Sequence, residues 1–269
     1  MNGYVSHLLY DFNTGIRDKS LMLMNYLFPI GFFLMVGAFM PRINPDFLHI
    51  MVPGMIIFAV MSGTLLTVPF TLIGQRETAI LRSFRVNGVP AHALITIPVV
   101  ACVIHMAVAA AILTAGSGLL YGARTPVNWF WFAGVFMLTT LSFATIGVLI
   151  GVVANSTRDG TLLAQAIYLP SVLLGGLMVP EALLPEGLRA GASILPATHA
   201  MRAFNSLALA GEPLSTATIL PIAVLAASVA INLALCFALF RWDSAPLDRR
   251  RRLIVLAAAA PFAVSIALA

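Results

Sequence analysis

The sequence predicts an all-α integral membrane protein, and three observations support this fold class. Of the 269 residues, 60% are hydrophobic and only 9% are charged, whereas a soluble domain has about 25% charged residues. Several apolar stretches reach the roughly 20 residues that a helix needs to cross a bilayer. The connecting segments are short and carry most of the arginines. So little polar sequence leaves no room for a catalytic domain outside the membrane.

Six membrane-spanning helices are expected from these apolar stretches. At 1.5 Å per residue, 20 residues cover about 30 Å, the thickness of a hydrocarbon core. The first span is expected to end at Pro41 and Arg42. Trp129, Trp131 and Trp242 flank spans, as indoles at headgroup depth do. The approximate bounds are residues 21–40, 50–73, 91–121, 129–154, 161–179 and 217–240.

The two ends of the chain differ from this pattern. Residues 1–19 are too polar to cross, but apolar side chains at helical spacing favour a helix in the membrane interface. A frayed terminus is the alternative. Within residues 246–269, the basic cluster Arg249–Arg252 precedes an apolar stretch, Leu253–Ala269, that Pro261 interrupts. This stretch is either a seventh span or a re-entrant or surface helix, so the transmembrane domain is expected to be residues 1–245.

The basic residues predict the orientation, because lysines and arginines near span ends are retained in the cytoplasm. With a cytoplasmic N-terminus, eleven of the fifteen basic residues lie inside. These are Arg17, Lys19, Arg76, Arg82, Arg85, Arg158, Arg241 and Arg249–Arg252. The outer four are Arg42, Arg124, Arg189 and Arg202. A cytoplasmic N-terminus is therefore expected, and basic residues dispersed in this way do not indicate nucleic-acid binding.

Polar groups inside the spans are few. His105 is the clear ionisable residue, and a neutral histidine bonded to a neighbouring helix explains it better than a proton relay without a carboxylate. Cys102 and Cys236 lie in apolar runs without ligand partners, so neither a disulfide nor a metal site is expected. Gly147 and Gly151 form a G-x-x-x-G pair that favours close helix packing inside the chain.

No motif for catalysis or nucleotide binding occurs. The chain lacks H-E-x-x-H and G-x-S-x-G, and its histidines have no acidic partners at ligand spacing. Its single lysine, Lys19, is not in a G-x-x-x-x-G-K-[ST] loop. Any energy for work must therefore come from another polypeptide.

Two polar segments carry a family resemblance. The first matches R-E-x-G-T-L-x-x-L-x-x-x-P at Arg76-Glu77, Thr78, Ile80-Leu81 and Pro90, without the usual glycine before the threonine and with a longer approach to the proline. The second comprises Leu169–Pro180, then Leu184-Pro185, then Leu195–His199. Both resemble type-2 ATP-binding-cassette (ABC) exporter permeases. The resemblance covers roughly residues 1–245 and implies a six-helix bundle with an N-terminal interfacial helix.

In that family, the loop between spans two and three is a coupling helix that docks on a cytoplasmic ATPase. The resemblance therefore implies ATPase contacts here, with a solvated loop whose arginines enforce topology as the alternative. The candidate coupling residues are Gln75, Arg76, Glu77, Thr78, Leu81, Arg82, Phe84 and Arg85. The N-terminal helix would add a second contact through Asp11, Arg17 or Asp18.

The segment from Pro180 to Glu212 is expected to hold two short helices, broken at Pro185 and Pro196, that dip back from the outer surface. Such an element would serve as an outer gate, and a simple surface loop is the alternative. The candidate gate residues are Pro180, Glu181, Pro185, Pro196, His199 and Arg202.

The resemblance implies the permease subunit of a bacterial exporter in the cytoplasmic membrane, surrounded by lipids and not itself an enzyme. Two ATPase subunits would bind ATP and magnesium. A second permease copy or a homologue would face this chain and complete the central substrate pathway. The chain itself would bind no cofactor or metal. Few charges along the path favour a lipophilic or amphipathic substrate, such as a drug, antibiotic or lipid. A permease for polysaccharides or lipid-linked glycans and a non-transporting scaffold are the alternatives.

Overall fold

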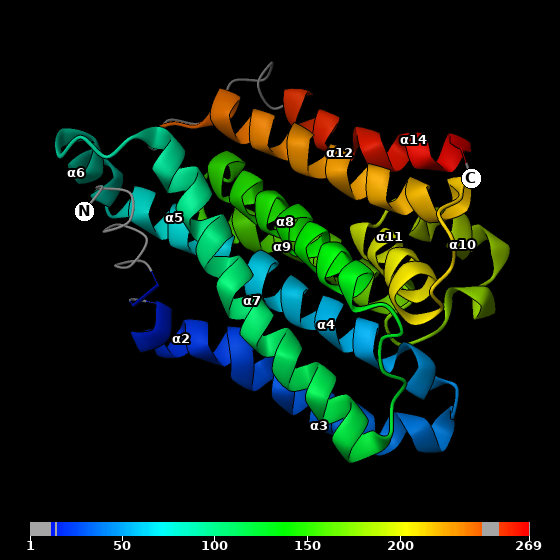
Figure 1. Ribbon diagram of the computed structural model, residues 1–269. Coiled ribbons are helices and arrows are strands. Elements are labelled where there is room, and N and C mark those ends of the chain that lie inside the picture. The colour runs from blue at the N-terminus through cyan, green and yellow to red at the C-terminus, as the bar shows by residue number, and fades with distance from the viewer. Residues whose placement is uncertain (1–11, 14, 244–252, 269) are drawn as a thin grey trace.

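The computed structural model describes residues 12–13, 15–243 and 253–268, and these residues form a helical bundle without strands (Figure 1). Five helices are long and apolar enough to cross a membrane, and a shorter apolar helix follows at Val255–Ile266. The predicted all-α membrane fold is confirmed. The five long helices are Lys19–Ile43, Phe47–Glu77, Ala91–Tyr121, Trp129–Val153 and Thr216–Leu239.

The first span consists of α2 (Lys19–Met22), the π-helical segment η1 (Leu23–Leu27) and α3 (Phe28–Ile43). Asp18 caps it, because its carboxylate accepts from the backbone N–H of Ser20 at 2.8 Å. The expected end at Pro41 is wrong: Pro41 lies inside the last turn, and the helix ends only where the backbone of Asn44 becomes extended.

The expected N-terminal interfacial helix is described only in part. Residues 12–13 and 15–17 are helical, and the rest of the expected helix, including Asp11, lies outside the described residues.

The second span is divided into α4 (Phe47–Leu65) and α5 (Val68–Glu77). A separate short helix, α6 (Ile80–Val86), follows after Ala79, whose positive φ of 61° turns the chain. The expected short charged helix between the second and third spans is present as α6, but it begins at Ile80, because Gln75, Arg76 and Glu77 continue the membrane helix. The divided arrangement attaches α6 to α5 through a tight turn.

Three further spans agree with the predicted bounds to within one residue: α7 (Ala91–Tyr121), α8 (Trp129–Val153) and α12 (Thr216–Leu239). The predicted packing role of Gly147 and Gly151 is confirmed. A Cβ at Gly147 would lie 2.6 Å from the carbonyl oxygen of Thr64, and one at Gly151 would lie 2.9 Å from Leu72 Cδ1. These glycines therefore let α8 approach α4 and α5 closely.

The helix expected at residues 161–179 is α9 (Thr157–Leu174), which begins earlier and ends earlier. It begins at Thr157 because Ser156 accepts from the backbone N–H of Asp159 at 3.2 Å. It ends before Gly176, whose φ of 83° belongs to the left-handed region. At 18 residues, α9 is not among the five helices long and apolar enough to cross a membrane.

Between α9 and α12, four short elements gather at the end of the bundle opposite α6 (Figure 1). They are the 3₁₀ turn η2 (Glu181–Leu183), α10 (Glu186–Ala192), α11 (Pro196–Ala203) and the π-helical η3 (Phe204–Leu209). Helix α11 contacts α4, α8, α9 and α12, so its backbone is enclosed by protein.

The C-terminal segment, η4 (Val255–Ala259) and α14 (Ala260–Leu268), packs along α12 (Figure 1). Val255 lines a cavity with Ala154 and Asp159, near the end of α8 and the start of α9. Ser265, in contrast, hydrogen-bonds to residues beside and within α11. The segment therefore runs antiparallel to α12 along much of the bundle. The basic cluster Arg249–Arg252 lies outside the described residues.

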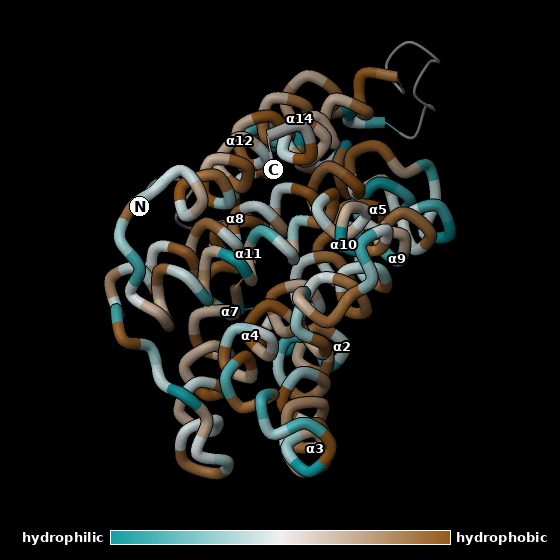
Figure 2. The backbone as a smooth tube through the Cα atoms, turned by 90° about the vertical axis from the view of Figure 1, so that its right-hand side faces the viewer, coloured by the Kyte–Doolittle hydropathy of each residue, from teal (hydrophilic) through white to brown (hydrophobic). Residues whose placement is uncertain are grey.

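Hydrophobic residues occur at the periphery of the bundle as well as inside it (Figure 2). On the first span, Phe39 is 61% exposed, and on α12, Phe237 is 48% exposed. Many other large apolar side chains are exposed as well, more than a water-soluble protein usually leaves in contact with water. This surface suits a hydrocarbon environment.

Candidate functional site

The end of the bundle that carries α6 is built on a buried arginine. Only 9% of Arg76 is exposed, and its guanidinium donates to the carbonyl oxygens of Val152 and Ala154, each at 3.2 Å, and to that of Gly151. These carbonyls belong to the C-terminal end of α8, where helices lack intrahelical donors and favour positive charge. Arg76 therefore joins α5 to α8. Its expected contact with an ATPase is corrected, because its side chain points into the protein.

Glu77 joins the same region to α9. Its carboxylate accepts from the backbone N–H of Thr157 at 3.3 Å and from the Thr157 hydroxyl at 3.5 Å. A carboxylate at the first residue of a helix is favourable because the helix dipole is positive there. The residues before α6 thus contact two other helices of the bundle.

Helix α6 has one inward-facing anchor and an exposed surface. Leu81 is only 1% exposed. The expectation that Leu81 contacts an ATPase is therefore wrong, because its side chain packs inside the protein. Arg82 and Arg85 are exposed and make no hydrogen bond or ion pair with the described part of the chain. Ile80 is 43% and Val86 is 86% exposed. This exposed surface of α6 is both apolar and basic.

The other candidate coupling residues, Gln75, Thr78 and Phe84, are exposed or half-buried. Phe84 is half-buried, and Thr78 is exposed, with its hydroxyl donating to the carbonyl oxygen of Gly74 at 2.7 Å. Gln75 and Phe84 both line a cavity beneath α6. Val86 was not among the predicted residues, although its position at the end of a short amphipathic helix could have indicated it.

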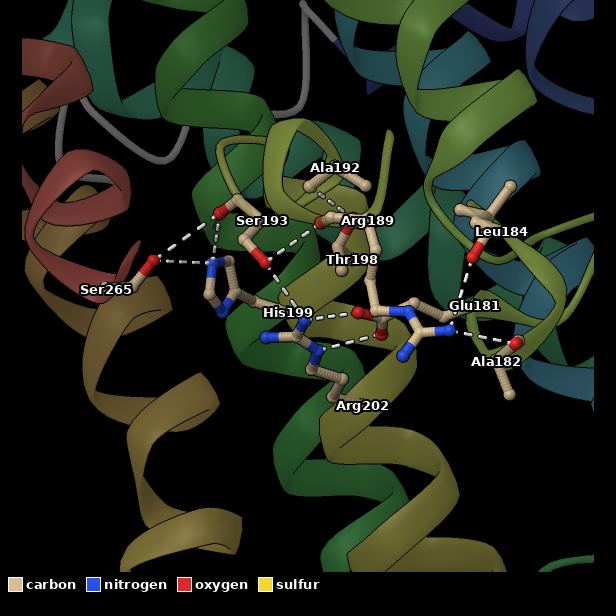
Figure 3. A network of polar contacts seen from close by, with 10 residues as sticks. All are labelled: Glu181, Ala182, Leu184, Arg189, Ala192, Ser193, Thr198, His199, Arg202 and Ser265. Atoms are coloured by element: carbon tan, nitrogen blue, oxygen red, sulfur yellow. Dashed lines mark hydrogen bonds and ion pairs between the residues drawn. The ribbon is translucent and has the colours of Figure 1, made fainter. Parts of the chain in front are cut away.

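The opposite end contains a polar network that joins the short elements (Figure 3). Arg202 of α11 forms an ion pair with Glu181 of η2, in which Nε donates to Oε2 at 2.9 Å. Arg202 also donates through Nη2 to the hydroxyl of Ser193 at 3.0 Å. Arg189 of α10 donates to the carbonyl oxygens of Ala182, at 2.9 Å, and Leu184. Two of the predicted gate residues, Glu181 and Arg202, are thus in direct contact.

His199 extends this network to the C-terminal helix. Its ring is fully buried, and burial lowers the pKa of His199 below the ordinary value for histidine. The neutral ring donates through Nε2 to the carbonyl oxygen of Ser193 at 2.9 Å, and the hydroxyl of Ser265 lies 3.3 Å from the same nitrogen. Ser193 and Ser265 were not predicted, because serines carry little sequence signal before the fold brings them together.

The three predicted prolines lie at the starts of elements, and the carbonyl oxygen of Pro185 accepts from the backbone N–H of Arg189 at 3.0 Å. Pro180 and Pro185 directly precede η2 and α10, and Pro196 is the first residue of α11. Proline suits the start of a helix because its missing N–H would have no helical acceptor there. The expected breaks at Pro185 and Pro196 are confirmed.

Glycines place the end of α9 against its neighbours. A Cβ at Gly54 of α4 would lie 2.7 Å from the carbonyl oxygen of Leu177, and one at Gly175 would lie 2.8 Å from the Cβ of Ala197. The chain after α9 therefore passes directly between α4 and α11. This close approach explains why small residues are needed in that segment.

Among the described residues, no group of three or more His, Cys, Asp or Glu side chains could hold a metal ion. The predicted bond from His105 to a neighbouring helix is confirmed: its Nδ1 lies 2.8 Å from the hydroxyl of Tyr26 in η1.

Comparison with known proteins gives one family. The sequence profile of the ABC-2 type transporter family matches residues 8–209. The putative transport permease YvfS of Bacillus subtilis (strain 168) is 22% identical over 219 residues, covering 79% of this chain and 88% of that protein. No solved structure matches. The match spans the bundle from the first span to η3 and includes both ends described above, and the chain is therefore a multi-pass membrane protein of the ABC-2 type transporter family.

Proposed function

We propose that this chain is the membrane subunit of a bacterial ABC exporter, driven by ATP that a separate subunit binds with magnesium and hydrolyses. Two ATPase subunits would dock beneath two permease subunits, either identical or homologous. The substrate would be lipophilic or amphipathic, and the N-terminus would be cytoplasmic in the bacterial inner membrane. Family membership supports a transport subunit in place of an enzyme.

One observation carries the proposal. Helix α6 has an exposed surface, while Leu81 and the preceding end of α5 are packed into the bundle. Arg82, Arg85 and Val86 are exposed, whereas Leu81 is buried and Arg76 binds the end of α8. A short helix with exposed apolar and basic side chains suits a groove on a protein partner. A partner that moved α6 would also move α5, α8 and, through Glu77, α9. This is the mechanical link that an ATP-driven change between inward-facing and outward-facing states requires.

The experiment compares arginines at the two ends of the bundle. The chain is reconstituted with its cognate ATPase in lipid nanodiscs, and hydrolysis is measured for wild type, Arg82→Ala with Arg85→Ala, and the control Arg42→Ala. Arg42 is exposed at the end of α3. We expect the α6 double variant to lose most permease-dependent hydrolysis and to release the ATPase on purification. The Arg42 variant should behave like wild type.

The proposal fails if no ATPase associates, or if the α6 variant hydrolyses ATP as wild type does. Stimulation by a charged glycan, without stimulation by any lipophilic compound, would favour a glycan exporter instead.

A further inference from the structure

A cavity of about 430 Å³ lies at the α6 end of the bundle and has no assigned role. Residues of the first span, α4, α5, α6 and α7 line it, and it is partly open. Asp18, Gln75 and Thr78 line it near the helix ends, and Asn25 and His105 line it further along the first span and α7. If α6 faces the cytoplasm, the cavity lies at the level of the cytoplasmic leaflet.

Its inner part contains two buried polar side chains. Asn25 is 6% exposed, and its Oδ1 has no hydrogen-bond partner among the described residues. His105 is 5% exposed and is held by the Tyr26 hydroxyl and by the ring of Phe12, whose centroid lies 4.7 Å from its own. A buried acceptor without a donor is costly, and a ligand can supply the donor.

Several polar groups of the cavity offer acceptors, and the side-chain amides of Asn25 and Gln75 can also donate. The hydroxyls of Thr67, Thr71 and Thr78 each donate to a backbone carbonyl one turn earlier, so their lone pairs are what remain for a ligand. Asp18 adds a carboxylate, and no lysine or arginine is among the described lining residues. Acceptors and a negative charge favour a positively charged donor. The rest of the lining is largely apolar and includes Leu21, Val68, Phe70, Ile80, Phe84 and Pro98.

We propose that this cavity binds an amphipathic cation, a protonated amine on a hydrocarbon body, entering from the cytoplasmic side. The ammonium would lie near Asp18 and the threonine oxygens, and the hydrocarbon would lie against Phe70 and Phe84. This inference rests on the proposed function, because it names the class of substrate that the exporter carries. Ile80 and Phe84 belong to α6, so an occupied cavity would contact the helix that docks the ATPase.

The test uses a cysteine as a reporter of occupancy. Gly74 lines the cavity, and a Cβ there would meet no atom within 4 Å. The native Cys102 and Cys236 are buried, so wild type gives the background rate. Gly74→Cys in nanodiscs is labelled with a water-soluble maleimide in the presence of dodecylammonium or laurate, which share a chain length and differ in charge. Gly187→Cys in α10, where a Cβ also meets nothing within 4 Å, is the control.

We expect dodecylammonium to slow labelling at position 74 but not at position 187, and laurate to slow neither. Asp18→Asn should raise the dodecylammonium concentration that halves the labelling rate at position 74 by about two- to fivefold, as expected for loss of one exposed charge. Asparagine also caps helices, so α2 should be retained. Equal protection by laurate, or no protection, would overturn the cation site.

Labelling needs no ATPase, so this result is independent of the docking experiment above. In one outcome, dodecylammonium protects Gly74→Cys from labelling and still fails to stimulate ATP hydrolysis in the complex with the ATPase. That result would support the binding site and overturn the proposal that the bound cation is a transported substrate.

Discussion

At the residue scale, two of the three candidate arginines of the α5–α6 region, Arg76 and Arg82, have opposite environments. Arg76 is buried and donates to carbonyl oxygens at the end of α8, whereas Arg82 is exposed. Both lie in one short polar segment, so composition alone treats them alike. Their environments assign Arg76 to stability and leave Arg82 accessible for the proposed partner contact.

Arg76→Gln is expected to destabilise the bundle by about 2 kcal/mol, because hydrogen bonds from a charged donor are lost and buried carbonyls remain unpaired. A thermal-unfolding measurement in detergent or nanodiscs, with Arg82→Gln as the matched control, checks this. The control should unfold at the wild-type temperature. Equal stability of the two variants would contradict the assignment of Arg76.

At the element scale, the C-terminal helix is part of the bundle and lies beside the polar network of α10 and α11. Phe262 of α14 is 4% exposed, and its ring centroid lies 5.9 Å from that of His199. Ser265 lies one helical turn further along and contacts the same histidine. Helix α14 therefore supports α11 from the side opposite the Glu181–Arg202 pair.

Phe262→Ala should lower stability by about 3 kcal/mol, since truncating a buried aromatic ring leaves a cavity. Leu256→Ala serves as the control because Leu256 is 70% exposed. Unfolding temperatures of both variants provide the measurement. A destabilisation of similar size in both would show that the packing against α11 is not what matters.

At the scale of the whole molecule, two different polar regions lie at opposite ends of one apolar bundle. The α6 end has exposed arginines at positions 82 and 85, and the α10–α11 end has a polar network that joins short elements (Figure 3). The distribution of arginines predicts that the α6 end faces the cytoplasm. The proposed docking and the proposed cation site both depend on this orientation.

Cysteines at Val86, which is 86% exposed, and at Gly187 test the orientation. In intact cells whose outer envelope is permeable to the reagent, a membrane-impermeant maleimide should label Gly187→Cys and leave Val86→Cys unlabelled until the membrane is broken. For each variant, labelling in intact cells is compared with labelling after the membrane is broken, which serves as the control for reactivity of the cysteine. The reverse pattern would place α6 outside and refute cytoplasmic docking.

The sequence by itself determined the membrane class, most span positions, the family and the two polar regions. These follow from composition, apolar run length and local motifs, which are properties of neighbouring residues. Helix ends were less predictable: α9 begins at Thr157 because of a serine cap, and the first span continues past Pro41.

Only the tertiary structure decided what the polar side chains do. Arg76 and the end of α8 are about 76 residues apart along the chain, and Ser265 and His199 are 66 apart. No local sequence pattern predicts such contacts. Hydrogen bonds between distant segments depend on how the helices pack, and helix packing depends on close approaches such as that of Gly147 to Thr64. The physical reason is that burial, which separates the structural Arg76 from the exposed Arg82, is a property of the assembled bundle.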